Sequence, residues 1–111
     1  MPDAPIMIVT GGSRGIGAAI ARLAGERGYD VCVNYTAAAG RAETVAEEIR
    51  SQGPRAITVK ADVSQPDDVE HLFTRTDNEL GPVDALVNNA GISLETPVAD
   101  HEVEAIRRMI D

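Results

Sequence analysis

Residues 6–17 read IMIVTGGSRGIG, a short apolar run followed by a turn that holds four glycines. The run lies between a proline and a glycine pair, so residues 6–9 are predicted to form a strand that is buried on both faces. Ile16, Ile20 and Leu23 then recur at helical spacing, and Gly28 stands where a helix stop is expected. The stretch therefore predicts a strand, a glycine-rich turn and a helix.

The same order of elements returns along the rest of the chain. Residues 31–34 and 56–61 are typical of strands, and the segment between them has a helical apolar face that ends at Gly53. That face consists of Ala42, Val45, Ala46 and Ile49. A fourth strand is predicted over residues 83–87.

Two further helices are predicted in the second half of the chain. One has Ser64 as its N-cap, Pro66 in its first turn and a buried stripe. The stripe is Val69, Leu72, Phe73, Thr76 and Leu80. The last helix begins after Pro97 and places Val103, Ile106 and Ile110 on one face. Strands that alternate with helices of this length predict an α/β fold of right-handed parallel units.

Length and composition limit the class of protein. The 111 residues fit one domain with one core, and the 18 acids against 10 bases give a net charge of −8. One lysine and three aromatic residues argue against nucleic-acid binding. The single cysteine, Cys32, excludes an intrachain disulfide and suits a reducing, cytoplasmic setting. The Cys and His residues lack the spacing of a zinc site, and no apolar run is long enough to span a membrane, so the sequence indicates neither a metal nor a membrane partner.

The glycine-rich turn has the composition of a phosphate-binding loop at a helix N-terminus. Gly11 is expected to permit the tight turn, Gly15 the approach of a phosphate, and Gly17 the close packing of helix and sheet. A nucleotide-triphosphatase loop is excluded, since Ala18 and Ala19 replace its Lys and Ser/Thr. A tight turn without a ligand is the plain alternative.

Three motifs in this order resemble the short-chain dehydrogenase/reductase family. They are TGGSRGIG at residues 10–17, Ala61-Asp62-Val63 after the third strand, and Asn88-Asn89-Ala90-Gly91 after the fourth. The first motif follows the TGxxxGxG form of the family rather than the TGxxGxxG form of its extended members. The resemblance covers essentially the whole chain. Within the family, the chain is most similar to the 3-oxoacyl-carrier-protein reductase or sugar dehydrogenase branch.

The resemblance implies a Rossmann-type doubly wound parallel sheet of strand order 3-2-1-4, with residues 1–111 as the dinucleotide-binding half of a single domain. It implies that Ser13, Arg14 and Ile16, with Gly11, Gly12, Gly15 and Gly17, surround the phosphates. It further implies that Asp62 bonds the adenine amino group and Val63 flanks the adenine ring. Asn88, Ala90 and Gly91 are expected beside the ribose.

Charge favours NADP(H) over NAD(H) as the cofactor. Selectivity for NAD usually needs a carboxylate about 20 residues beyond the glycines, whereas Asn34, Tyr35 and Thr36 occupy that place. Arg14, with Arg41 as a helper, would supply positive charge to a 2′-phosphate.

The residues that carry the family's chemistry are a Ser and a Tyr-x-x-x-Lys pair, and residues 1–111 contain no such pair. Tyr29 and Tyr35 are followed four places later by Val33 and Ala39. We therefore assign no catalytic residue and expect this chain, without the catalytic half, to be inactive alone. The whole protein is expected to be a homo-oligomeric oxidoreductase that moves hydride between NADP(H) and a small carbonyl or alcohol. The alternative is a non-catalytic NADP(H)-binding module or a subunit of a two-chain assembly.

Overall fold

The structure is a computed structural model and describes residues 4–89. Its elements in chain order are β1 (Ile6–Thr10), α1 (Gly15–Glu26), β2 (Asp30–Tyr35), α2 (Ala39–Arg50), β3 (Ala56–Lys60), α3 (Pro66–Glu79) and β4 (Ala85–Asn88). The strands form one parallel sheet of order β3-β2-β1-β4, which confirms the predicted topology. Ala90, Gly91 and the helix predicted after Pro97 lie outside the described residues.

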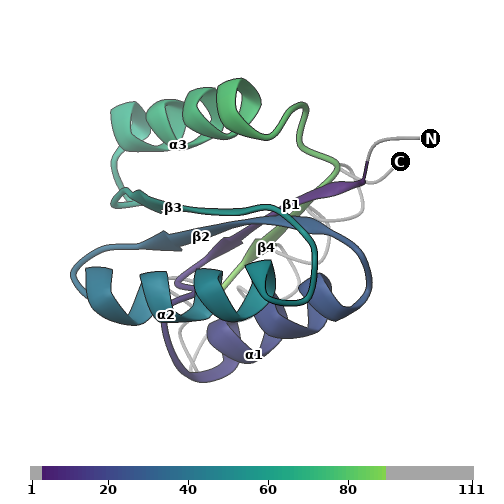
Figure 1. Cartoon of the computed structure of the whole chain (residues 1–111). Helices are drawn as coiled ribbons and strands as arrows, with labels where there is room; N and C mark the ends of the chain where they lie inside the picture. Colours follow the sequence, from purple (N-terminus) through teal and green to yellow (C-terminus); the bar gives the residue numbers. More distant parts are fainter. Residues whose placement is uncertain (1–3, 90–111) are drawn as a thin grey trace.

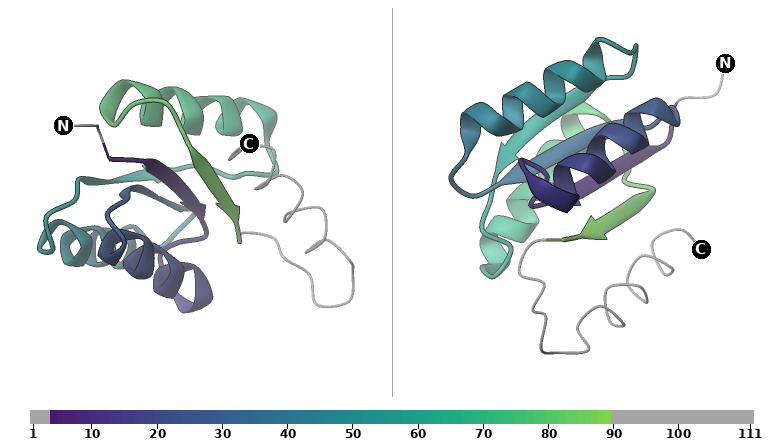
Figure 2. Two further views of the ribbon diagram at one scale, coloured as in Figure 1. Left: turned by 90° about the vertical axis from the view of Figure 1, so that its right-hand side faces the viewer. Right: turned by 90° about the horizontal axis from the view of Figure 1, so that it is seen from below.

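Helices cover both faces of the sheet. Helices α1 and α2 lie on one face and α3 lies on the other (Figures 1 and 2). The register pairs Val9 of β1 with Val33 of β2 and with Val87 of β4. Because all four strands run in one direction, their carboxyl ends and the loops that follow them meet at one edge of the sheet.

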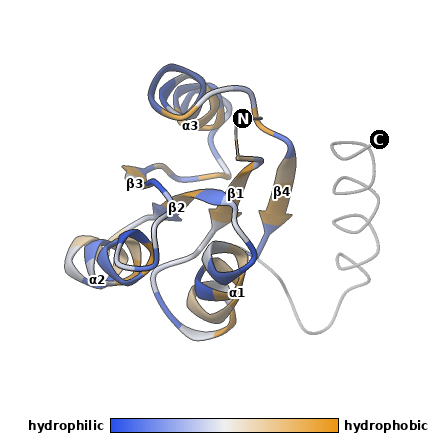
Figure 3. Cartoon of the chain, turned by 45° about the vertical axis from the view of Figure 1, so that its right-hand side comes forward, coloured by the Kyte–Doolittle hydropathy of each residue, from blue (hydrophilic) through white to orange (hydrophobic). Residues whose placement is uncertain are grey.

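Strands β1 and β4 are mainly hydrophobic, and the helices mix hydrophilic with hydrophobic residues (Figure 3). Two buried apolar clusters lie between the layers. One buried cluster, which includes Val9, Val33 and Ile49, lies between the sheet and helices α1 and α2. The other, which includes Ile8, Val59 and Leu72, lies under α3. Among the helices of residues 4–89, none has the length and apolar character needed to cross a membrane.

The apolar stripe that predicts α1 is only partly the face that packs on the core: Ile20 packs against the buried cluster, but Ile16 and Leu23 do not. Ile16 is 72% exposed and Leu23 is 47% exposed. The buried positions of α1 are small residues instead: Gly17, Ala18, Ala21, Ala24 and Gly25. A Cβ added at Gly25 would lie 2.9 Å from Cγ2 of Ile49, so small residues allow α1 to approach α2 closely.

Two helix ends test the predicted boundaries. The stop at Gly28 is confirmed: its N–H donates to the carbonyl of Gly25, and the N–H of Tyr29 donates to Ala24, which is a Schellman motif. The predicted N-cap at Ser64 is wrong, because Gln65 holds that position and makes no side-chain cap bond. The Ser64 hydroxyl donates to Oδ1 of Asp62 instead (2.6 Å).

The buried stripe predicted for α3 is confirmed at Leu72, Thr76 and Leu80, with Val69 and Phe73 partly buried. Strand β4 is shorter than predicted and begins at Ala85 rather than at residue 83. The side-chain carboxylate of Asp84 accepts the N–H of Ile6 (2.8 Å). In a continuing strand a main-chain carbonyl would accept this bond.

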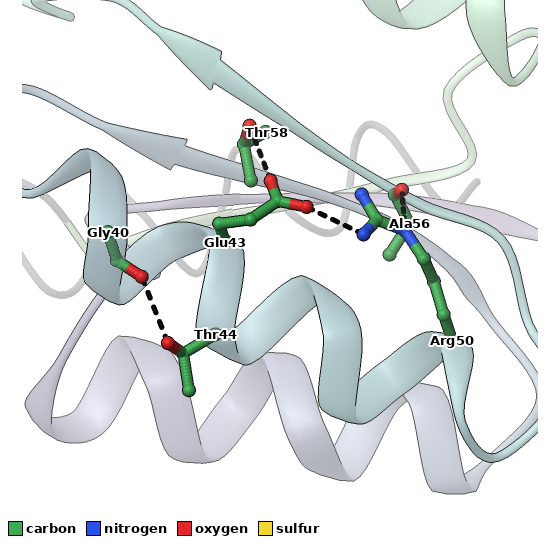
Figure 4. Close-up of polar contacts among 6 residues, drawn as sticks. All are labelled: Gly40, Glu43, Thr44, Arg50, Ala56 and Thr58. Carbon is green, nitrogen blue, oxygen red and sulfur yellow. Dashed lines mark hydrogen bonds and ion pairs between the residues drawn. The ribbon is translucent and has the colours of Figure 1, made fainter.

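Polar contacts fasten α2 to the edge strand β3 (Figure 4). The carboxylate of Glu43 accepts hydrogen bonds from Arg50 (2.7 Å) and from the hydroxyl of Thr58 (3.4 Å). Nε of Arg50 also donates to the carbonyl of Ala56 (3.0 Å). These bonds fix the side of α2 that faces β3. Residues Arg41, Thr44 and Val45 of the same helix border the glycine-rich turn.

Candidate dinucleotide-binding site

The glycine-rich turn leaves β1 and enters α1 without a spacer. Gly11 has a φ of 61°, which confirms its expected use in a tight turn. A Cβ at Gly17 would lie 2.1 Å from the carbonyl oxygen of Gly11. The close approach that Gly17 permits is thus to the turn itself, whereas the sequence predicted an approach to the sheet.

The start of α1 presents main-chain N–H groups to the carboxyl edge of the sheet. The first-turn amides of a helix have no intrahelical acceptor, and Arg14 at the N-cap makes no side-chain cap bond. Gly15 has a φ of 61°, and a Cβ built on it would meet nothing within 4 Å. The backbone here borders open space, so an anionic ligand can approach it closely.

A cavity of about 340 Å³ lies between this turn and the end of β2. Its lining residues are Gly11, Ser13, Arg14, Asn34, Tyr35, Thr36, Ala37 and Ala38. It thus brings together both parts of the predicted site, the phosphate loop and the residues at the end of β2. The lining holds a guanidinium and no carboxylate.

A second cavity, of about 300 Å³, lies between α1 and α2 and shares Ser13 and Arg14 with the first. Its other lining residues are Gly15, Ala18, Arg22, Arg41, Thr44 and Val45. Arg22 donates two hydrogen bonds to Glu48 (2.8 and 3.1 Å), and these bonds hold the pKa of the Glu48 carboxyl below its ordinary value. Within residues 4–89, Arg14 and Arg41 are in no ion pair, so both charges are available to an anion.

Asp62 follows β3 and is exposed at the same edge of the sheet. Its Oδ1 accepts hydrogen bonds from the hydroxyl (2.6 Å) and the N–H (2.9 Å) of Ser64, and these bonds lower the pKa of the Asp62 carboxyl. The N–H of Asp62 donates to Oδ2 of Asp68 in the first turn of α3 (2.7 Å). The carboxylate of Asp62 is therefore charged at neutral pH and held in a fixed turn.

Val63 and Asn88 lie apart from the two basic cavities. Both line a small, mostly apolar cavity of about 90 Å³ beneath α3, together with Thr10, Val69, Leu72, Phe73 and Leu86. The hydroxyl of Thr10 donates to Oδ1 of Asn88 (2.9 Å), which ties the end of β1 to the end of β4. Gly12, Ile16, Gly17 and Asp62 lie in or beside the turns and do not line these three cavities.

The sequence analysis missed two features of the site. One is the structural role of Asn34, itself a predicted site residue: it lines the first cavity, but its side-chain amide bonds to the glycine-rich turn and to the end of β3. The other is Asp68, whose place in a first helical turn favours the ordinary interpretation of an acid that complements the helix dipole. Neither role has a sequence signal, because both depend on which loops meet at the sheet edge.

A parallel sheet with a glycine-rich turn at the start of α1 and basic cavities beside it defines a Rossmann-type dinucleotide-binding fold. The family model of the short chain dehydrogenases matches residues 5–111. The chain belongs to the short-chain dehydrogenase family.

Two curated relatives indicate how much of such a protein the chain represents. A 3-oxoacyl-(acyl-carrier-protein) reductase of Staphylococcus epidermidis is 44% identical over 86 residues, which cover 78% of this chain and 35% of the relative. A versicolorin reductase of Emericella nidulans is 46% identical over 90 residues, which cover 81% of this chain and 34% of the relative. The chain thus spans about a third of the length of these relatives.

Solved structures with bound cofactors share the fold. A short chain dehydrogenase from Burkholderia cenocepacia in complex with NADP has a TM-score of 0.78 and 36% identity, over 97% of this chain and 50% of that one. A blue fluorescent protein from a metagenomic library in complex with NADPH has a TM-score of 0.77 and 39% identity, over 90% of this chain and 43% of that one.

Proposed function

We propose that this chain is the NADP(H)-binding half of an oxidoreductase that moves hydride between NADP(H) and a small carbonyl or alcohol substrate. The observation that carries the proposal is the pair of adjoining cavities that share Ser13 and Arg14. One reaches the end of β2, where residues 34–36 include no acid, and the other holds Arg41 as a second unpaired cation.

The residues of the site fit a phosphorylated dinucleotide. The glycines leave space for a pyrophosphate at the first turn of α1, where Gly15 borders open space. A 2′-phosphate at the end of β2 would lie near Arg14, with Arg41 in the adjoining cavity, and would meet no carboxylate from the lining residues. Ala90 and Gly91, which lie outside the described residues, remain proposed ribose neighbours. The bound cofactor would supply the hydride, while this chain's residues bind and orient it.

The chain by itself is predicted to reduce no carbonyl compound. Its residues hold no Tyr-x-x-x-Lys pair, and the cofactor cannot replace a general acid that protonates the substrate oxygen. Turnover of a ketone at an enzyme-like rate by residues 1–111 would contradict this assignment. Sustained NADPH binding without turnover in the whole protein would favour the alternative, a non-catalytic binding module.

A fluorescence titration with NADPH and NADH tests the proposed cofactor. Arg14→Ala is expected to weaken NADPH about tenfold to a hundredfold, because a hydrogen bond to a charged group contributes roughly 1.5 to 3 kcal/mol. NADH, which lacks the 2′-phosphate, should bind nearly as before. Arg27→Ala is the matched control, since Arg27 is exposed at the opposite end of α1.

The pattern across the two cofactors decides the result. Equal losses for NADPH and NADH in Arg14→Ala would show that Arg14 does not recognise the 2′-phosphate. Arg41→Ala is expected to give a smaller loss, confined to NADPH, because Arg41 borders the second cavity and not the first.

A further inference from the structure

The side chain of Asn34 is 1% exposed, lies one residue before the end of β2 and has its hydrogen-bonding groups engaged on two sides. Its Oδ1 accepts the N–H of Gly11 (3.3 Å), and its Nδ2 donates to the carbonyls of Val59 and Ala61 (3.1 Å each). The carbonyl of Asn34 also accepts the N–H of Gly12 (2.9 Å). One residue therefore bonds to the phosphate loop and to the end of β3.

These two loops have no direct strand pairing to hold them together. The phosphate loop follows β1 and the loop of Asp62 follows β3, and β2 lies between these strands in the sheet. The second loop is also held from its outer side, where the N–H of Asp62 donates to Asp68 (2.7 Å). Asn34 is the inner support that the two loops share.

We propose that Asn34 is a positioning residue that sets the separation of the phosphate loop and the Asp62 loop, and through it the affinity for the adenosine end of the dinucleotide. The inference rests on the proposed function and adds to it a residue that acts through main-chain bonds. A carboxamide is suited to this role because it offers an acceptor and two donors. An aspartate has no donor when ionised and would face two carbonyl oxygens.

The first readout is amide hydrogen exchange in the ligand-free protein, with Asn34→Leu compared with the wild type, because leucine has nearly the same shape but neither the acceptor nor the donors. Exchange at Gly11 and Gly12 and at Ala61 and Asp62 is expected to accelerate about tenfold, because both loops lose the same support. Thr76→Val is the matched control. Thr76 is equally buried, and its hydroxyl donates to the carbonyl of Leu72 (2.8 Å) and contacts the thiol of Cys32, neither of which lies in the two loops, so its loss should leave both loops unchanged.

The second readout is the affinity for adenosine 2′,5′-bisphosphate, measured by calorimetry where circular dichroism shows each variant to be folded. Asn34→Leu, which adds no charge beside the 2′-phosphate, is expected to bind this probe about tenfold more weakly than wild type, and Thr76→Val within about twofold. Asn34→Ser retains an acceptor and one donor and should fall between these values. It also serves as the test variant if Asn34→Leu does not fold.

The two readouts separate the possible failures. Faster exchange at one loop alone, or at neither, in a folded variant would overturn the proposal for Asn34. Failure of the wild type to bind adenosine 2′,5′-bisphosphate would overturn the proposed cofactor, and the exchange data would still decide whether Asn34 holds the two loops.

Discussion

The two ends of the same four strands are closed in different ways. At the amino end, acidic side chains accept main-chain N–H groups: Asp84 accepts that of Ile6, and Asp30 that of Arg55 (2.8 Å each). The guanidinium of Arg55 returns to the Asp30 carboxylate (2.8 Å) and to the carbonyl of Leu80 (2.9 Å). Asp30 is 4% exposed, so its charge is satisfied by groups of the chain itself.

At the carboxyl ends of β1 and β2, the chain leaves positive groups without internal partners, whereas the loop after β3 carries the acid pair Asp62 and Asp68. The first turn of α1 has no side-chain cap, and the two cavities beside it are lined by arginines and no acid. The comparison shows that the parallel sheet itself does not create a site. The site arises because acids accept the free N–H groups at the amino end, whereas glycines and cations at the carboxyl ends of β1 and β2 leave a surface that an anion can bind.

The largest effect is expected from a methyl group at the carboxyl end. In Gly17→Ala the new Cβ would lie 2.1 Å from the Gly11 oxygen and 2.8 Å from Nδ2 of Asn89. Overpacking of this kind costs typically 1 to 3 kcal/mol, roughly 3 here, and exceeds the gain of about 1 kcal/mol that alanine brings to a helix. We expect lower stability in urea and loss of NADPH binding.

Gly40→Ala is the matched control for Gly17→Ala. Gly40 is also helical, but a Cβ there would meet nothing within 4 Å. Its unfolding free energy should rise by about 0.5 kcal/mol, because alanine has the better helix propensity. Equal behaviour of the two variants would contradict the close contact between α1 and the turn.

A side chain at Gly15 should remove binding and leave the fold largely intact. In Gly15→Val the added atoms would enter the open space in front of the first turn of α1. The left-handed φ of 61° adds strain of about 1 to 3 kcal/mol. Gly28→Val is the matched control, since Gly28 has a φ of 91° and equally open surroundings away from the site. Similar melting temperatures with NADPH binding lost only in Gly15→Val would support the phosphate site.

The elements were predictable because each carries its own signal, but the meeting of loops was not. Residues 6–9 are an apolar run bounded by turn residues, which predicts one strand, whereas the strand order was implied by the family resemblance. Ile16 and Leu23 misled because periodicity marks an apolar face and does not tell which neighbour covers it.

The sequence equally could not reveal Asn34 as a support. Its position after an apolar run indicates only a strand end, and the role depends on loops that lie 23 and 27 residues away. The site residues of the phosphate loop were accessible because glycines restrict what a turn can do. Arg14 and Thr36 meet at one cavity as a consequence of the sheet order.

At the amino end, Asp30→Ala should cost stability without changing cofactor affinity. The variant loses the bonds from the N–H and Nε of Arg55 to the Asp30 carboxylate, and we expect the unfolding free energy in urea to fall by about 2 kcal/mol. The loss is not larger because water can hydrate the exposed guanidinium. Glu26→Ala, a change of an exposed acid, is the control. Weaker NADPH binding by folded Asp30→Ala would show that the two ends of the sheet are coupled.

The smallest expected effect on stability concerns Cys32, which is buried in the middle of β2, between the two ends of the sheet. Burial raises the pKa of its thiol from 9.0 to about 11. A raised folded-state pKa means that the thiol's contribution is complete below pH 9 and is lost as the pH rises toward 11, because the unfolded chain ionises first. Between pH 8 and pH 9.5 the unfolding free energy should therefore fall by about 0.8 kcal/mol more in wild type than in Cys32→Ala. The subtraction removes the other groups that titrate in this range. If the unfolding free energies of the two proteins change with pH in parallel, the thiol is open to solvent. The expected difference would show that the thiol is buried in the core.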